Sequence, residues 1–169
     1  MMKKIWIALL SVMIGAVFVP IQRVLVFEYE NTGKVLGYME IGEEMTFAVK
    51  YTHSIHLSDV IETYKLNEDG QIVQQQLEYE DFAIGMPSDA QGNETFVEKD
   101  GRYMITNMNR VFNHVDLRIG QVVANHTLIY RKHQIPLSSF VKEGTWIRID
   151  YRLINLWEML EGVNILEQR

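Results

Sequence analysis

The sequence predicts an all-β domain of antiparallel strands, arranged as a sandwich or a partly open barrel. Through most of the chain, short segments alternate apolar and polar side chains with the period of a half-buried strand. Glycine, asparagine and aspartate separate these segments, as at Asp69-Gly70, a pair that suits a hairpin turn. Helical patterns occur only near the two ends. A length of 169 residues fits one domain better than two.

The N-terminus carries the features of an export signal. Lys3 and Lys4 precede an apolar stretch from Ile5 to Val19, which Pro20 closes. The stretch is at the short end of a membrane span, and no small-x-small cleavage site follows it. We therefore expect residues 1–23 to be a signal anchor, single-pass in the cytoplasmic membrane, with the domain on the outer face. If this leader is cleaved as a signal peptide instead, the protein is secreted.

Residues 24–152 are expected to form the extracytoplasmic β domain. Its predicted strands, in chain order, are Val24–Glu30, Lys34–Ile41, Glu44–Thr52, Val60–Asn67, Gln71–Glu80, Thr95–Lys99, Arg102–Asn107, Val111–Ile119, Val122–Lys132 and Trp146–Tyr151. Turn signals at Asp100-Gly101 and Gly120-Gln121 predict compact hairpins between the strands that flank them.

Residues 153–169 change from the strand period to the helix period. Apolar side chains recur at helical spacing at Leu153, Leu156, Trp157, Leu160 and Val163. We expect a short amphipathic C-terminal helix whose apolar side packs on the sheet. A helix lying on a membrane surface is the disfavoured alternative, because its polar residues include Glu158 and Glu161 rather than a basic face.

Composition and motifs exclude several classes of function. The formal net charge is -6 and no basic stripe is present, so we expect no nucleic-acid partner. The chain has no cysteine, which excludes disulfides, cysteine lipidation and thiol catalysis. The sequence contains no G-x-S-x-G elbow, P-loop or G-x-G-x-x-G motif. We therefore assign no catalytic residue, no metal ligand and no cofactor.

A histidine and a glutamate lie on strand faces that are otherwise apolar. The face that carries Tyr51 continues to His53, and Glu62 shares a face with Val60, Tyr64 and Leu66. A hairpin with residues 54–59 as its loop would place Tyr51 opposite Glu62 and His53 opposite Val60. His53 then lies diagonally across from Glu62, within reach of long side chains. A buried acid must be paired or hydrogen-bonded, or its pKa rises.

A third polar position is His126, which shares a predicted strand face with Val122, Ala124, Leu128 and Tyr130. We expect a ligand- or partner-binding site formed by Tyr51, His53, Ser54, Glu62 and His126. Two alternatives stay open. The residues could form a hydrogen-bonded network that serves structure alone. Alternatively, His53 and Glu62 could serve a hydrolase or a metal-binding enzyme, although no H-E-x-x-H or similar spacing is present.

Several motifs resemble one family of bacterial proteins. They are the block Phe47 to Ile55 followed by Glu62, the turn Gly85-Met86-Pro87, and a C-terminal group formed by Arg118 to Gly120, Ala124 to Leu128, Ile135 to Leu137 and Gly144. Together they resemble the family called domain of unknown function 1850, from Val24 to Tyr151. Carried across by motif, the marked positions are Tyr51, His53, Ser54, Glu62, Gly85, Pro87 and His126.

This resemblance implies a small exported or membrane-anchored protein without an established activity. Members are typically encoded beside tripartite ATP-independent periplasmic (TRAP) transporters of the TAXI type, whose solute-binding proteins capture organic anions. We therefore expect a membrane-anchored accessory protein rather than an enzyme, with TRAP transporter subunits or the solute-binding protein as partners. The helical tail from Leu153 onward departs from the family's pattern.

Overall fold

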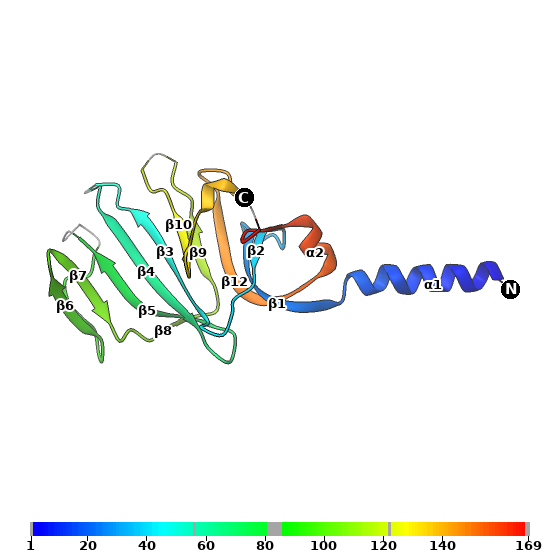
Figure 1. The fold of residues 1–169 in the computed structure, drawn as a ribbon, viewed down its shortest axis with the longest axis horizontal. Coiled ribbons are helices and arrows are strands. Elements are labelled where there is room, and N and C mark those ends of the chain that lie inside the picture. The colour runs from blue at the N-terminus through cyan, green and yellow to red at the C-terminus, as the bar shows by residue number, and fades with distance from the viewer. Residues whose placement is uncertain (1, 56, 81–85, 122, 168–169) are drawn as a thin grey trace.

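The chain forms two β-sheets, with one helix extending away from them (Figure 1). A computed structural model describes residues 2–55, 57–80, 86–121 and 123–167. Among the described residues, all strand pairs are antiparallel except one short parallel pair between β2 (Val35–Met39) and β13 (Val163–Asn164). The predicted antiparallel, mostly β architecture is therefore confirmed, and neither sheet closes into a barrel.

The smaller sheet has five strands in the order β13-β2-β1-β12-β9. They are β1 (Pro20–Tyr29), β2 (Val35–Met39), β9 (Val115–Arg118), β12 (Trp146–Asn155) and β13 (Val163–Asn164). Its centre is the long pair β1 and β12, which runs from Pro20 opposite Asn155 to Tyr29 opposite Ile147. The first strand after the N-terminal helix therefore pairs with a strand close to the end of the chain.

The larger sheet has eight strands, of which seven follow the order β11-β10-β3-β4-β5-β7-β6. These strands are β3 (Thr46–Thr52), β4 (Asp59–Leu66), β5 (Ile72–Tyr79), β6 (Thr95–Lys99), β7 (Arg102–Thr106), β10 (Thr127–Tyr130) and β11 (His133–Pro136). The eighth, β8 (Arg110–Phe112), pairs with β5 beside this row.

The main core lies between the two sheets. Leu25 and Phe27 of β1 belong to the same buried cluster as Phe47 and Tyr64 of the larger sheet. The short helix η1 (Leu137–Ser139) adds fully buried Leu137 to this cluster. Apolar side chains at alternate strand positions therefore meet across the sandwich, as the period of the sequence predicts.

The predicted strand Val111–Ile119 is two strands in different sheets. β8 pairs with β5 in the larger sheet, whereas β9 pairs with β12 in the smaller one. The chain crosses between the sheets at Asn113, whose side-chain oxygen accepts a hydrogen bond from Gln71 at 3.0 Å. The alternation of apolar and polar residues continues from β8 into β9 because strands of both sheets turn one face toward a shared interior.

The hairpin predicted at Gly120-Gln121 is absent from the described residues. β9 pairs with β12 and β10 pairs with β3 and β11, so the two segments are not neighbours. The hairpin that does form joins β10 to β11 through Arg131 and Lys132. Arg131 has a φ of 52°, a left-handed conformation that arginine seldom adopts, and so the sequence carried no turn signal there.

The C-terminal helix is present, but its predicted packing is wrong. The helix α2 (Leu156–Glu161) has six residues, and Leu153 still belongs to β12. The apolar side chains that were expected to face the sheet are exposed, at 43% for Leu156, 54% for Trp157 and 80% for Leu160. Met159 packs against the outer face of the smaller sheet instead.

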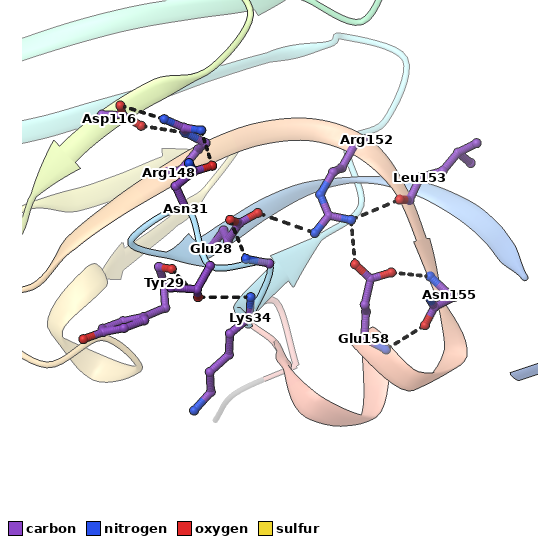
Figure 2. Close-up of polar contacts among 12 residues, drawn as sticks. Glu28, Tyr29, Asn31, Lys34, Asp116, Arg148, Arg152, Leu153, Asn155 and Glu158 are labelled. Carbon is purple, nitrogen blue, oxygen red and sulfur yellow. Dashed lines mark hydrogen bonds and ion pairs between the residues drawn. The ribbon is translucent and has the colours of Figure 1, made fainter. Parts of the chain in front are cut away.

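Polar contacts explain why α2 is turned this way (Figure 2). Asn155 and Glu158 form a capping box, in which each side chain accepts a hydrogen bond from the other residue's backbone N–H at 2.9 Å. Glu158 also accepts from Arg152 at 2.7 Å, and Arg152 lies 3.8 Å from buried Glu28. The glutamate that was expected to face solvent therefore binds the helix to the sheet.

The N-terminal helix α1 (Met2–Val17) has 16 residues and extends away from the sheets (Figure 1). Its described side chains are exposed up to Ala16, and only Val17 is partly buried. Strand β1 follows almost at once, at Pro20, four residues before the predicted start of the β domain. Among the described residues, no helix has both the length and the apolar character needed to cross a membrane.

Candidate functional site

The hairpin of β3 and β4 carries four of the five predicted site residues, and its register differs from the predicted one. Val49 lies opposite Glu62 and Tyr51 opposite Val60, whereas the prediction placed Tyr51 opposite Glu62. The shift is an even number of residues, so every apolar side chain keeps the face that was predicted for it. Only the partners across the ladder change, and Glu62 becomes a diagonal neighbour of Tyr51.

His53 and Ser54 lie in the turn of this hairpin. The backbone N–H of His53 donates to the Ser58 carbonyl at 2.8 Å, which closes a shorter loop than the one predicted. The shortening depends on Leu57, whose φ of 56° is left-handed. His53 thus lies four ladder positions from Glu62, about 13 Å along the strand. The predicted diagonal arrangement of these two residues is wrong, and Ser54 is exposed.

Glu62 is partly buried on the inner face of β4, and its closest polar partner is Tyr64. The Tyr64 hydroxyl donates to Oε2 of Glu62 at 2.7 Å. Burial raises the pKa of Glu62, and the hydrogen bond from Tyr64 partly offsets this effect. Burial and the neighbouring Glu62 charge likewise raise the pKa of the Tyr64 hydroxyl. Sequence analysis placed Tyr64 on this face but did not identify it as the partner of Glu62.

Tyr51 and His126 form the second pair of the site. Their ring centroids are 5.3 Å apart and the planes are inclined by 31°. The register of β3 and β10 explains this contact: Leu128 pairs with Val49, so extending the ladder by two residues places His126 opposite Tyr51. Burial, and to a smaller extent the charge of Glu62, raises the pKa of Tyr51 to about 12. Tyr51 therefore stays a neutral hydrogen-bond donor at physiological pH.

His126 is 7% exposed and precedes β10 rather than lying within it. Its Nδ1 accepts a hydrogen bond from the Gly120 N–H at 3.2 Å, which places the proton of the neutral ring on Nε2. Burial lowers the pKa of His126, with a smaller opposite effect from the Ala124 backbone. The ring borders a cavity of about 360 Å³ that is also lined by Asn125, Ser138 and Glu143.

We refer to Tyr51, Glu62, Tyr64 and His126 as the polar cluster. Beyond it, the inner face of the larger sheet is lined by a second apolar cluster whose members include Val60, Leu77, Tyr79, Phe96, Tyr103 and Ile105. Tyr103 stacks on both Tyr79 and Phe96, with centroids 5.6 and 6.0 Å apart. No strand of the smaller sheet contributes a described residue to this second cluster. One half of the larger sheet thus carries aromatic side chains on the face that bears Glu62, which pairs with Leu77 of the second apolar cluster.

The family-marked turn Gly85-Met86-Pro87 is only partly described. Gly85 lies outside the described residues, whereas the Pro87 carbonyl accepts a hydrogen bond from the Tyr79 hydroxyl. Met86 packs against the second apolar cluster. The marked positions Tyr51, Glu62 and Pro87 thus belong to, or contact, the same half of the larger sheet.

The polar cluster offers hydrogen-bonding groups within an aromatic surround. Among the described residues, none donates a hydrogen bond to Oε1 of Glu62, so this oxygen remains an acceptor. The described part of the chain contains no group of three histidine, aspartate or glutamate side chains that could hold a metal ion. Because the register separates His53 from Glu62, the geometry also gives no support to acid–base catalysis by that pair.

These features define a two-sheet β protein with a tyrosine-lined glutamate on one inner face. The chain belongs to the family described as domain of unknown function (DUF1850), whose model matches residues 47–137. The match spans the strands from β3 to β11, and Tyr51, Glu62, Tyr64 and His126 all lie within it. Comparison with curated proteins and with solved structures finds no match.

Proposed function

We propose that this protein is an extracytoplasmic accessory protein, tethered to the cytoplasmic membrane by α1, that binds a ligand or partner through the polar cluster. One observation carries the binding part of the proposal: a partly buried carboxylate lies among tyrosines, and its Oε1 accepts no hydrogen bond from any residue that the structure describes. A group buried in this way lowers the stability of the fold when it is charged. Proteins accept such a penalty where function requires the charge.

The chemistry of the cluster favours a ligand that donates hydrogen bonds or carries positive charge. Glu62 supplies an acceptor, and the partly buried rings of Tyr51 and Tyr103 are electron-rich groups that attract cations. His126, which contacts Tyr51, favours the neutral form because burial lowers its pKa. A protonated amine on a small molecule or on a partner's side chain fits these groups better than an organic anion does.

The transporter association rests on the sequence rather than on the site. The family resemblance points to TRAP transporters of the TAXI type, and the Lys-Lys start followed by apolar α1 supports a membrane anchor. We infer that the partner is a TRAP transporter subunit or its solute-binding protein. Anchoring beside a membrane transporter would raise the local concentration of one protein at the other.

The proposal is tested with the full chain and two matched variants. Glu62→Gln removes the charge of the cluster and keeps its volume, whereas Glu43→Gln removes an exposed charge elsewhere. Thermal shifts are measured against a library of amines, amino acids and carboxylates. We expect amine-bearing compounds to raise the melting temperature of the parent and of Glu43→Gln, but not of Glu62→Gln.

Two further results bear on the same proposal. Co-purification of TRAP subunits from detergent-solubilised membranes should be lost in Glu62→Gln and retained in Glu43→Gln. If carboxylates and amines shift the parent and Glu62→Gln alike, and the subunits co-purify with both, then the polar cluster is not a binding site and its role is structural.

A further inference from the structure

The exposed side of α2 forms an apolar surface outside the core. Leu156, Trp157 and Leu160 are 43%, 54% and 80% exposed, whereas Glu158 and Met159 on the other side of the helix are partly buried. Phe18, directly after α1, is 54% exposed and lies against Trp157 with ring centroids 6.2 Å apart. We call these four residues the apolar patch. Two segments at opposite ends of the sequence thus form one surface.

The apolar patch adjoins the point where α1 meets the domain. Pro20, the first residue of β1, lies opposite Asn155, the residue that caps α2. The α2 helix therefore begins beside the place where the chain enters the sheet, and Figure 1 shows α2 at the end of the domain from which α1 extends. The exposed apolar surface of α1 continues through Phe18 into the patch without an intervening charged residue in the chain.

We propose that the apolar patch inserts into the interfacial layer of the lipid bilayer that α1 enters. The inference rests on the proposed membrane tether and adds a second contact to it. Tryptophan and phenylalanine are typical of membrane interfaces, where an aromatic body meets apolar chains and polar head groups together. The position of Glu158 agrees with this arrangement, because it is turned inward to Arg152. The exposed residues of α2 are therefore Leu156, Trp157 and Leu160, with Glu161 as the one charged residue among them.

The length of α1 supports the same arrangement. Its 16 residues span about 24 Å, which is about 6 Å less than the hydrocarbon core of a bilayer. Apolar side chains at an interface commonly lie about 5–10 Å deep. Immersion of the patch to that depth would bring the end of the domain next to α1 into the interface. It would thereby compensate for the difference between the length of α1 and the thickness of the hydrocarbon core.

Charge at the margin of the patch indicates which lipids suit it. Glu161 is exposed and lines the same shallow hollow as Trp157 and Leu160. A carboxylate there is repelled by anionic head groups and tolerated by zwitterionic ones. Insertion should therefore be stronger in phosphatidylcholine vesicles than in vesicles rich in phosphatidylglycerol.

The three tryptophans of the chain allow a direct test with the full-length protein. Trp6 lies in α1, Trp157 in the patch, and Trp146 at the far end of β12, about 30 Å along the strand from Asn155. Three variants each keep one tryptophan and replace the other two by phenylalanine. Each is reconstituted into phosphatidylcholine vesicles whose acyl chains carry bromine, a short-range quencher of indole fluorescence.

We expect bromine to quench Trp6 and Trp157 at least threefold more strongly than Trp146. In the variant that keeps only Trp157, Leu160→Asp should reduce quenching at least twofold, and Ile55→Asp, an exposed residue of the β3–β4 turn, should leave it unchanged. If only Trp6 is quenched, the proposed insertion of the apolar patch is wrong, whereas the proposed membrane tether by α1 is supported. Failure to quench Trp6 would instead overturn the tether itself.

A protein contact at the patch would give a different result. If a second copy covered Trp157, its fluorescence would depend on the ratio of protein to lipid and would be insensitive to bromine. That outcome would also refute the inference, since the patch would then be an interface between chains.

Discussion

The Tyr64 hydroxyl donates a hydrogen bond to Oε2 of Glu62 at 2.7 Å, between two side chains on the same face of β4. Strand alternation alone places residues two apart on one face, so this contact needs no long-range coincidence. The pair also couples the ionisation of Glu62 to the stability of the domain, because burial raises the pKa of that carboxyl group.

Glu62→Gln should stabilise the protein at neutral pH. Since the folded-state pKa of Glu62 is raised, its contribution to stability is most favourable below pH 4.5 and declines as pH rises through the folded value. At pH 7.5 we expect the melting temperature of Glu62→Gln to exceed that of the parent by about 2–4 °C, which corresponds to roughly 1 kcal/mol. At pH 4, Glu62→Gln and the parent should have the same melting temperature. The control Glu43→Gln should have the melting temperature of the parent at both pH 4 and pH 7.5. A lower melting temperature at pH 7.5 would show that the charge of Glu62 stabilises the fold.

The hydrogen bond between Tyr64 and Glu62 is measured with a double-mutant cycle. Tyr64→Phe should lower the free energy of unfolding by about 1–2 kcal/mol in the parent and by much less in a Glu62→Leu background. Tyr130→Phe is the control. Tyr130 lies on β10 of the same sheet, and its hydroxyl accepts a hydrogen bond from the Gly42 N–H at 2.7 Å rather than bonding to Glu62. Its effect should be equal in both backgrounds, and equal effects of Tyr64→Phe would contradict the coupling.

His126→Gln should lower the free energy of unfolding more at high pH than at low pH. This differs from Glu62, whose contribution to stability is largest at low pH. Burial lowers the pKa of His126 below 6.5, so the stability that the neutral ring supplies is full above pH 6.5 and is lost as pH falls through the lowered value. We expect a loss of about 1–3 kcal/mol at pH 8, from the Gly120 hydrogen bond and the Tyr51 contact, and a smaller loss at pH 5. Exposed His133→Gln serves as the control. A loss that is constant with pH would show that His126 does not titrate differently on folding.

Arg152 should be required for docking of the C-terminal segment. Arg152→Met removes the cation that lies 3.8 Å from Glu28, which is 8% exposed, and also removes a partner of Glu158 (Figure 2). Chemical denaturation should show a loss of about 1–3 kcal/mol. Adding Glu28→Gln should recover part of this loss, because it removes a buried charge that Arg152 no longer neutralises and keeps the acceptor for the Gly33 N–H. Lys34→Met, an exposed control, should change stability little.

The proposed membrane orientation has its own test. A reporter that is active only outside the cytoplasm, fused after residue 169, should be active. N-terminal sequencing of the membrane fraction should find the residues before Pro20 retained. Activity of a reporter that works only inside the cytoplasm would refute export, and a mature start near Gln22 would refute the anchor.

The sequence predicts the architecture of the larger sheet well because its strands β3 and β4 bury one face more than the other. In the smaller sheet, β1 is buried on both faces from Val24 to Phe27. Alternation identified β1 to β7 close to their observed bounds and gave every inward side chain of β3 and β4 correctly. What alternation cannot set is the register, because a shift by two residues preserves every face. The register depends on Leu57, which adopts a left-handed φ of 56°. Glycine or asparagine at this position would have indicated such a turn in the sequence, but leucine does not.

In the candidate site, too, alternation predicts which face a side chain occupies but not where a strand ends or which residues are neighbours. Tyr51, Glu62 and His126 were found because polar groups on apolar faces stand out, and the structure brings these three together with Tyr64. His53 obeyed the same alternation, but a turn ends the strand before it. The orientation of α2 could not be predicted from its apolar spacing, because Met159 and Glu158 hold the opposite side to the sheet.

The pairing of β1 with β12 constrains the order in which this protein can fold. β1 is the first strand to follow the N-terminal helix, yet its partner ends at Asn155. A chain that emerges from its N-terminus must therefore hold β1 unpaired on that side until almost the whole sequence has appeared. The larger sheet, from β3 to β11, contains its own pairings and can assemble earlier, whereas closure of the smaller sheet is a late, long-range step. Truncation before β12 should thus leave an aggregation-prone edge on β1 rather than a smaller folded protein.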